Sequence, residues 1–242
     1  MCHSNDSRPP ASPVVTGEVA EHGPLEITAA DGNRFSAYRA TPSVPNGRSL
    51  LLLPDVRGLH PFYRDLAQRF AEAGFHTLAM DYYGRTAGTG PRDGEFDGLP
   101  HLDLLDPAHV ETDAAAALPA LGDAGPVYSL GFCLGGGYSW RLAGAGLGLA
   151  GAVGFYGSPV FVGDRTADIT APVLMLLAGD DVATPQKDFD AFAAILEAAG
   201  KDVRMHVYDG APHSFFDREH AEWQDACADA WRRVLDFTAA TA

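Results

Sequence analysis

A cysteine, an aspartate pair and a histidine occur in this chain with the spacing and order that nucleophilic catalysis needs. Cys133 stands in Gly131-Phe132-Cys133-Leu134-Gly135, between an apolar run and a predicted helix. This spacing is typical of a sharp strand-to-helix turn, where residues two before and two after the nucleophile must lack a Cβ. The helix N-terminus favours a thiolate, and the Leu134 N–H can point at a developing oxyanion. The pattern predicts Cys133 as a nucleophile; the alternative is a buried cysteine beside packing glycines.

A thiol nucleophile also needs a base and an acid that orients the base, and both follow Cys133 in the chain. Asp180 and Asp181 come directly after the apolar run 173–177, and His213 lies in the Gly/Pro-containing loop 210–215 after the next apolar run. At such turns the order along the chain is nucleophile, acid, base. A lone histidine is more often structural, but three positions in this order favour catalysis. We therefore expect His213 as the base and Asp180 or Asp181 as the acid.

The loop that begins at Pro54 offers further polar groups at the same edge of the predicted sheet. It follows the first parallel strand, where a second oxyanion N–H is usual, and Val56 is the residue expected to supply it. Asp55 is either a proton acceptor for the thiol or a structural carboxylate that caps the strand end or pairs with Arg57. His60 is expected to line the mouth of the site. The other histidines show no metal-ligand spacing and no dinucleotide fingerprint is present, so we predict no metal and no cofactor.

Short apolar runs alternate with helical patterns from residue 50 onward, which predicts an α/β domain with a mostly parallel, doubly wound sheet. An antiparallel hairpin at its N-terminal edge is expected from the runs 25–28 and 35–38 around Asp31-Gly32-Asn33. The remaining strands are expected at 50–53, 77–80, 127–130, 152–155, 173–177 and 203–208, and the helices at 61–73, 107–121, 135–147, 185–199 and 218–238. We expect one domain over residues 16–242 and a flexible tail over residues 1–15.

Composition and charge exclude several classes of protein. The chain has 242 residues and a net charge of −15, from 17 Lys plus Arg against 32 Asp plus Glu, which argues against a nucleic-acid partner. The uncharged stretch 142–163 contains too many glycines for a membrane-spanning helix, so no membrane association is expected. The N-terminus lacks the apolar core of a secretory signal, and three cysteines make no disulfide framework. Both points favour the cytoplasm. Cys2 belongs to the tail and Cys227 to a helix face that packs inward.

An acidic segment lies between the second and third parallel strands. Residues 93–124 contain eight Asp or Glu and no Lys or Arg. A solvated acidic loop and helix is the simpler interpretation, and a lid that repels anions is the alternative.

Taken together, residues 25–238 resemble the dienelactone hydrolase family of α/β-hydrolases. The matching motifs are Gly131-Phe132-Cys133-Leu134-Gly135-Gly136, the Asp181 loop closed by Pro185, Ala211-Pro212-His213-Ser214-Phe215, and Asp81-Tyr82-Tyr83-Gly84-Arg85. The family's spacing from the acid to the following proline selects Asp181 rather than Asp180.

The resemblance implies a small-molecule ester or lactone as substrate and a Cys-His-Asp triad that forms an acyl-enzyme. Family members carry a glutamate at the position of Asp55, and it takes the thiol proton; here the side chain is one methylene shorter. The family clamps a substrate carboxylate with arginines, one of them four residues after the histidine, where this chain has Asp217. Arg57, Arg85 and Arg218 are the candidates to take its place, and Tyr83 is a further candidate to contact substrate.

A neutral ester or lactone is therefore an open alternative to an anionic one. Thioester hydrolysis by the same triad is a second alternative, and a non-catalytic protein that binds a ligand in the inherited pocket is a third. The sequence does not indicate an oligomeric state.

Overall fold

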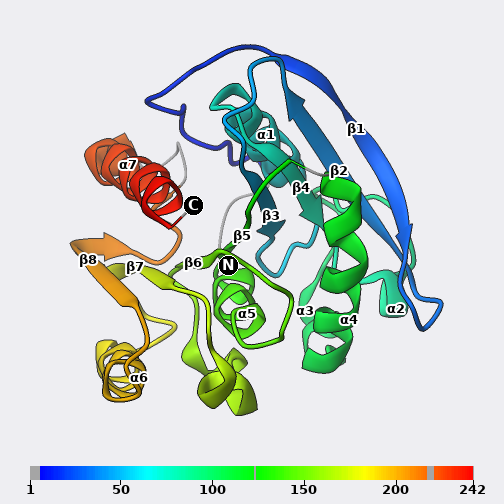
Figure 1. Cartoon of the computed structure of the whole chain (residues 1–242). Coiled ribbons are helices and arrows are strands. Elements are labelled where there is room, and N and C mark those ends of the chain that lie inside the picture. The colour runs from blue at the N-terminus through cyan, green and yellow to red at the C-terminus, as the bar shows by residue number, and fades with distance from the viewer. Residues whose placement is uncertain (1–5, 123, 217–220, 242) are drawn as a thin grey trace.

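The computed structural model describes residues 6–122, 124–216 and 221–241. An eight-stranded sheet runs through the molecule in the order β1-β2-β4-β3-β5-β6-β7-β8 (Figure 1). The strands are β1 Val19–Thr28, β2 Arg34–Pro42, β3 Ser49–Leu53, β4 His76–Met80, β5 Val127–Phe132, β6 Gly151–Phe155, β7 Val173–Asp180 and β8 Val203–Pro212. Neighbours from β4 to β8 pair in parallel, and β2 pairs antiparallel with both β1 and β4. The expected parallel sheet with an antiparallel hairpin edge is confirmed.

Helices cover both faces of the sheet. They are α1 Pro61–Glu72, α2 Gly84–Ala87, α3 Leu99–Leu102, α4 Pro107–Ala117, α5 Leu134–Leu142, α6 Gln186–Ala198 and α7 Gln224–Ala240. On one face, α1 and α7 bury an apolar cluster that includes Phe70 and Trp231, whose ring centroids are 4.3 Å apart. On the other face, α4, α5 and α6 bury a second cluster that includes Trp140 and Phe192. The central strands are apolar on both sides because each side faces a helix layer.

Three helices differ from their expected ranges. The helix expected at 107–121 ends at Ala117, and a 3₁₀ turn, Leu118–Leu121, follows it. The helix expected to reach residue 147 ends at Leu142, and it could not include residue 146 because Gly146 has a φ of 70°, which is incompatible with a right-handed helix. The last helix begins at Gln224 rather than at residue 218, and a short 3₁₀ turn, Ala221–Trp223, precedes it. Residues 217–220 lie outside the described part of the chain.

The segment before β1 contacts the body of the domain. The Ser7 side chain is fully buried, and its Oγ accepts a hydrogen bond of 3.0 Å from NH1 of Arg57. Farther along, the Thr16 N–H donates to the carbonyl of Glu72 at the end of α1. The flexibility expected for residues 1–15 stays a prediction, and residues 1–5 lie outside the described ranges.

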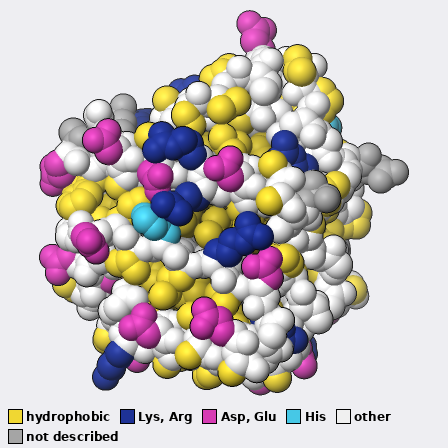
Figure 2. Space-filling model, turned by 60° about the vertical axis from the view of Figure 1, so that its left-hand side comes forward, with side chains coloured by type: hydrophobic (Ala, Val, Ile, Leu, Met, Phe, Trp, Pro, Cys, Tyr) yellow, Lys and Arg dark blue, Asp and Glu magenta, His cyan; other side chains and the backbone are white. Residues whose placement is uncertain are grey.

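The surface combines charged and apolar side chains. Figure 2 turns the left-hand side of Figure 1 forward and shows hydrophobic side chains between basic and acidic ones. Among the residues that the structure describes, no helix is both long and apolar enough to cross a membrane.

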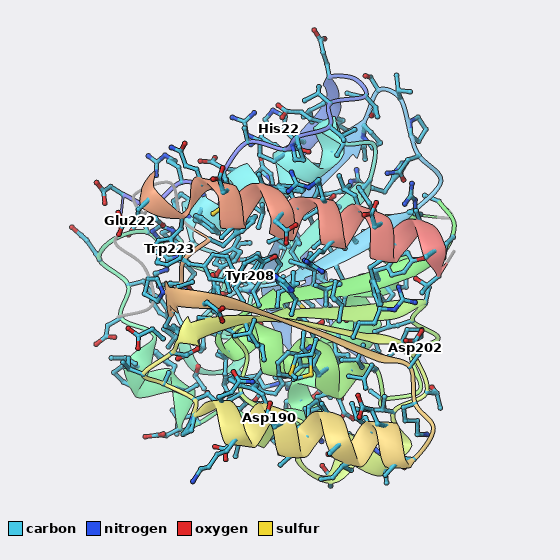
Figure 3. The ribbon with its side chains drawn as sticks, turned by 90° about the vertical axis from the view of Figure 1, so that its left-hand side faces the viewer. His22, Asp190, Asp202, Tyr208, Glu222 and Trp223 are labelled. Carbon is cyan, nitrogen blue, oxygen red and sulfur yellow. The ribbon has the colours of Figure 1, made fainter. Side chains whose placement is uncertain are left out.

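The parallel strands bring the predicted site residues to one edge of the sheet. Figure 3 shows β7 and β8 from the side, between α6 and α7, and both strands end near the labelled Trp223. Because parallel strands have their carboxyl ends at the same edge of the sheet, the loops after β3, β5, β7 and β8 lie along that edge. These loops carry Asp55, Cys133, Asp181 and His213.

Candidate active site

Cys133 occupies a sharp turn between β5 and α5. Its φ of 52° and ψ of −114° are strained for a residue with a side chain. A Cβ on Gly131 would overlap the carbonyl oxygen of Gly135, and a Cβ on Gly135 would overlap that of Leu53. Both glycines are therefore required by close backbone contacts. The Cys133 N–H donates to the carbonyl of Phe155 over 3.0 Å, which ties the turn to the end of β6.

Asp181 and His213 lie together at the ends of β7 and β8. Oδ2 of Asp181 is 2.8 Å from Nδ1 of His213. The other carboxylate oxygen, Oδ1, accepts the N–H groups of Ala183 and Thr184 at 2.7 and 3.3 Å. The loop thus fixes one oxygen and turns the other toward the imidazole. Asp180 is exposed, and the structure pairs His213 with Asp181.

Tyr156 connects the histidine to the cysteine turn and was not singled out by the sequence analysis. It follows β6, has a φ of 36°, and is almost completely buried. Its ring centroid is 4.9 Å from that of His213, and its chain neighbour Phe155 accepts the hydrogen bond from Cys133. His213 and the Cys133 turn therefore both contact the end of β6. No sequence signature marks the positive φ of Tyr156 at the end of β6, so its place beside His213 could be found only from the structure.

Asp55 lies in a buried ion pair with Arg57. The backbone N–H, Nε and NH2 of Arg57 donate to the Asp55 carboxylate at 2.9 to 3.2 Å. The backbone N–H of Asp55 donates to the hydroxyl of Tyr63 over 2.9 Å. Burial and the nearby Asp55 carboxylate raise the pKa of Tyr63 well above its ordinary value, so the hydroxyl stays protonated. Asp55 was expected either to accept the thiol proton or to act as a structural carboxylate. These contacts fit the structural role, with Arg57 as the partner of Asp55.

The two residues expected to supply oxyanion N–H groups flank this region. Leu134 is the first residue of α5 and is almost fully buried. Val56 follows Asp55, and its carbonyl accepts a hydrogen bond of 2.7 Å from the hydroxyl of Tyr83. Tyr83, a candidate to contact substrate, thus supports the backbone of the Val56 loop.

The remaining candidate substrate contacts have partners within the protein. Nδ1 of His60 accepts the Phe62 N–H at the start of α1, and His60 is buried, so it caps the helix. Arg85 pairs with Asp31 and Asp113, both at 2.8 Å. Arg218 lies outside the described residues. Arg57 and Arg85 thus both form ion pairs with carboxylates of the protein, and their contact with a substrate stays a prediction.

A buried ion pair between Asp81 and Arg92 shapes the same edge. NH2 of Arg92 donates to Oδ2 of Asp81 over 3.0 Å, and the carboxylate also accepts the N–H groups of Leu59 and Tyr83. Burial raises the pKa of Asp81, and the Arg92 charge opposes that shift. The pair holds the loop after β3 to the loop after β4. Sequence reasoning noted Asp81 only as part of a motif and did not identify Arg92, because the two lie eleven residues apart with irregular chain between them.

The acidic segment is partly internal. Asp113 is buried against Arg85 and Asn33, and Glu111 pairs with Arg141 and Arg165. The other described acids of the segment are exposed, namely Asp93, Glu95, Asp97, Asp103 and Asp106. Within the described residues, no group of three or more His, Cys, Asp or Glu side chains is arranged to hold a metal ion.

Comparison with known proteins gives consistent matches over nearly the whole chain. The model of the dienelactone hydrolase family matches residues 35–241. A candidate carboxymethylenebutenolidase of Salmonella typhi is 28% identical over 98% of this chain and 96% of its own length. A candidate 2-oxo-3-(5-oxofuran-2-ylidene)propanoate lactonase of a Bradyrhizobium species is 28% identical over 86% of this chain and 90% of its own. The crystal structure of a candidate dienelactone hydrolase from Klebsiella pneumoniae has a TM-score of 0.75 and 25% identity, covering 90% of this chain and 99% of that one.

Proposed function

Because the chain belongs to the dienelactone hydrolase family and is thus a hydrolase of ester or lactone bonds, we propose that it acts through a Cys133 thiol, with His213 as base and Asp181 as the acid that orients it. The observation that carries this proposal is the strained Cys133 turn at the same sheet edge as the His213–Asp181 pair. Strain at one non-glycine residue is typical of a nucleophile held at a strand-to-helix turn.

The proposed reaction begins with proton transfer from the thiol to His213. With Nδ1 hydrogen-bonded to Asp181, the nitrogen that exchanges this proton is Nε2. The sulfur attacks the carbonyl carbon, and the negative charge that develops on the carbonyl oxygen is stabilised by the N–H groups of Leu134 and Val56. The imidazolium then protonates the leaving alcohol, and the C–O bond breaks to leave a thioester on Cys133.

Water completes the cycle. His213 removes a proton from a water molecule, which attacks the thioester carbonyl, and the tetrahedral intermediate expels the thiolate with release of the carboxylic acid. The acid product carries the former carbonyl carbon, and the free enzyme is restored. No electron transfer is needed at any step.

Asp55 remains a candidate proton acceptor in this proposal, but its ion pair with Arg57 supports a structural role more directly. Small-molecule esters and lactones are the substrate class that the family suggests. Residence in the cytoplasm and the lack of a nucleic-acid partner stay predictions from the sequence. Thioester hydrolysis is the second candidate, because a thiol triad that attacks an ester carbonyl can also attack a thioester.

The test compares wild type with Cys133→Ala on a dienelactone, p-nitrophenyl acetate and an acyl thioester. Cys227→Ala is the matched control, since Cys227 is the other described cysteine and is buried in α7. We expect Cys133→Ala to lose turnover on every substrate that the wild type accepts, while Cys227→Ala keeps it. Intact-mass spectrometry after rapid acid quench should show one acyl group on the wild type only. Full activity in Cys133→Ala contradicts the proposal, and unchanged ligand on prolonged incubation favours the binding protein.

A further inference from the structure

Three loops at the Cys133 edge expose apolar side chains. The first is residues 98–104: a Cβ on Gly98 would overlap the carbonyl oxygen of Val56, so this segment lies directly against the Val56 loop. It carries Leu99 and Leu104, which are 59% and 62% exposed.

The second loop follows β6 and packs on the first turn of α5. A Cβ on Gly137 would meet Phe161 and the carbonyl oxygen of Ser158, so residues 158–161 lie within one helical turn of Cys133. Val160, in the middle of this segment, is 73% exposed.

The third loop carries the triad acid itself. Val182 follows Asp181 and is 93% exposed, although Asp181 is buried against His213. Together these loops hold four of the nine large hydrophobic side chains that are exposed in the described residues. Exposed apolar side chains on neighbouring loops at one edge of the sheet indicate a binding surface.

The charges at this edge disfavour an anion. After β3 and β4, the arginines Arg57, Arg85 and Arg92 are each held by a buried carboxylate. Between residues 93 and 106, all charged side chains are exposed Asp or Glu. Asp180, at the start of the third loop, is a further exposed carboxylate. Lys187, in the first turn of α6, is exposed and lies next to the exposed Asp188. Among the residues that the structure describes, a substrate carboxylate at this edge would therefore meet exposed acidic side chains and arginines that already pair with carboxylates.

On the premise of the Cys133 mechanism above, we propose that the site takes an uncharged ester whose acyl chain contacts the apolar rim of Leu99, Leu104, Val160 and Val182, and that it discriminates against esters bearing a carboxylate. The reacting carbonyl lies at the Cys133 turn, and the chain extends outward along the rim. The apolar rim then favours an uncharged acyl chain, and the acidic surroundings disfavour an ester that bears a carboxylate.

A matched pair of substrates tests this. The p-nitrophenyl ester of hexanoic acid and the mono-p-nitrophenyl ester of adipic acid differ only in a terminal methyl against a terminal carboxylate. We expect kcat/KM for the hexanoate to exceed that for the adipate at least about tenfold, and to exceed that for p-nitrophenyl acetate by about tenfold because four more carbons contact the rim. Raising the ionic strength should increase the adipate rate and leave the hexanoate rate unchanged.

Rim variants identify the surface responsible. Val160→Asp and Val182→Asp should each lower the ratio of kcat/KM for the hexanoate to kcat/KM for p-nitrophenyl acetate about fivefold to twentyfold. Ile195→Asp is the control, because Ile195 is 56% exposed on α6, outside the three loops.

The outcomes separate this inference from the mechanism on which it rests. Equal or faster hydrolysis of the adipate, lost in Cys133→Ala, overturns the substrate class and leaves the thiol mechanism standing. Equal effects of Ile195→Asp and the rim variants also overturn it. If no ester in the series is hydrolysed in a Cys133-dependent way, the mechanism fails and the substrate class fails with it.

Discussion

Nδ1 of His213 lies 2.8 Å from Oδ2 of Asp181, while the adjacent carboxylate of Asp180 is exposed to solvent. The separation of the two carboxylates comes from the loop after β7, whose Ala183 N–H holds Oδ1 of Asp181 at 2.7 Å. One of two neighbouring acids is thereby fixed beside the imidazole.

Asp181→Asn should therefore lower kcat about a hundredfold to ten-thousandfold, because an amide neither stabilises an imidazolium nor enforces the correct tautomer. Asp180→Asn is the matched control and should change kcat less than about twofold. Steady-state kinetics on a p-nitrophenyl ester measures both. If the Asp180 variant shows the larger loss, Asp180 is the triad acid.

The glycines of the Cys133 turn are expected to tolerate no side chain. Gly131→Ala places a Cβ on the carbonyl oxygen of Gly135, so we expect a loss of more than about 3 kcal/mol of stability and of nearly all activity. Gly23→Ala is the control, since nothing lies within 4 Å of a Cβ there. Urea unfolding monitored by circular dichroism gives the comparison, and a Gly131→Ala protein as stable as Gly23→Ala would refute the close contact.

We expect the buried side chains of Asp81 and Arg92 to stabilise the fold only when both are present. Arg92→Met leaves the Asp81 carboxylate buried without its charge partner and should cost about 3–5 kcal/mol of unfolding free energy. Adding Asp81→Asn removes the unpaired charge and should recover part of that loss. Urea denaturation of the single and double variants measures the coupling between the two side chains. Simple additivity of the two single-variant losses would show that the charges do not interact.

The role of Asp55 can be decided by thiol reactivity. If Asp55 supports the loop through Arg57, Asp55→Asn lowers stability by about 3 kcal/mol and kcat/KM with it, but leaves the pH profile of Cys133 alkylation by iodoacetamide in place. Because Cys2 also reacts, alkylation at Cys133 is followed by peptide mass spectrometry. A shift of that profile to higher pH would instead make Asp55 the proton acceptor.

Two histidines outside the site should make the fold less stable in mild acid. Burial lowers the pKa of His76 and His206 below 6.5, and the positive charges of Arg39 and Arg233 lower them further. The unfolded chain then binds more protons than the folded one as the pH falls through 6.5, so unfolding free energy decreases there and is recovered above it. The doubly substituted His76→Gln, His206→Gln protein should show a smaller loss between pH 7.5 and pH 5.5. An identical pH dependence in both proteins would exclude these two groups.

The sheet and the triad positions were accessible from the sequence because each has a local signature. The apolar run 127–130 followed by Gly131-Phe132-Cys133-Leu134-Gly135 predicts both β5 and its turn, and the structure has the strand at Val127–Phe132. The acid after β7 and the histidine after β8 follow from chain order. The structure places Asp181 and His213 in contact, and their catalytic roles remain a proposal.

The sequence does not show which partners a charged side chain contacts when loops set the distance between them. The sequence offered Arg57 both as a contact for substrate and as a partner for Asp55. Its hydrogen bond to Ser7 had no signature, because Ser7 lies in a segment with no periodic pattern. Arg85 is likewise bound by Asp31 and Asp113, which lie on the hairpin turn and on α4. Such pairings require the full three-dimensional arrangement, because charged residues carry no sequence mark of their partners.

At the nucleophile turn, the close contacts of Gly131 and Gly135 are all with backbone atoms. A serine at position 133 would meet the same backbone conformation and the same neighbouring carbonyls. The turn therefore constrains where the reactive atom lies but not which element it is. A single base change in a cysteine codon can produce serine, so thiol and alcohol chemistry are separated in this architecture by one mutational step that leaves the scaffold intact.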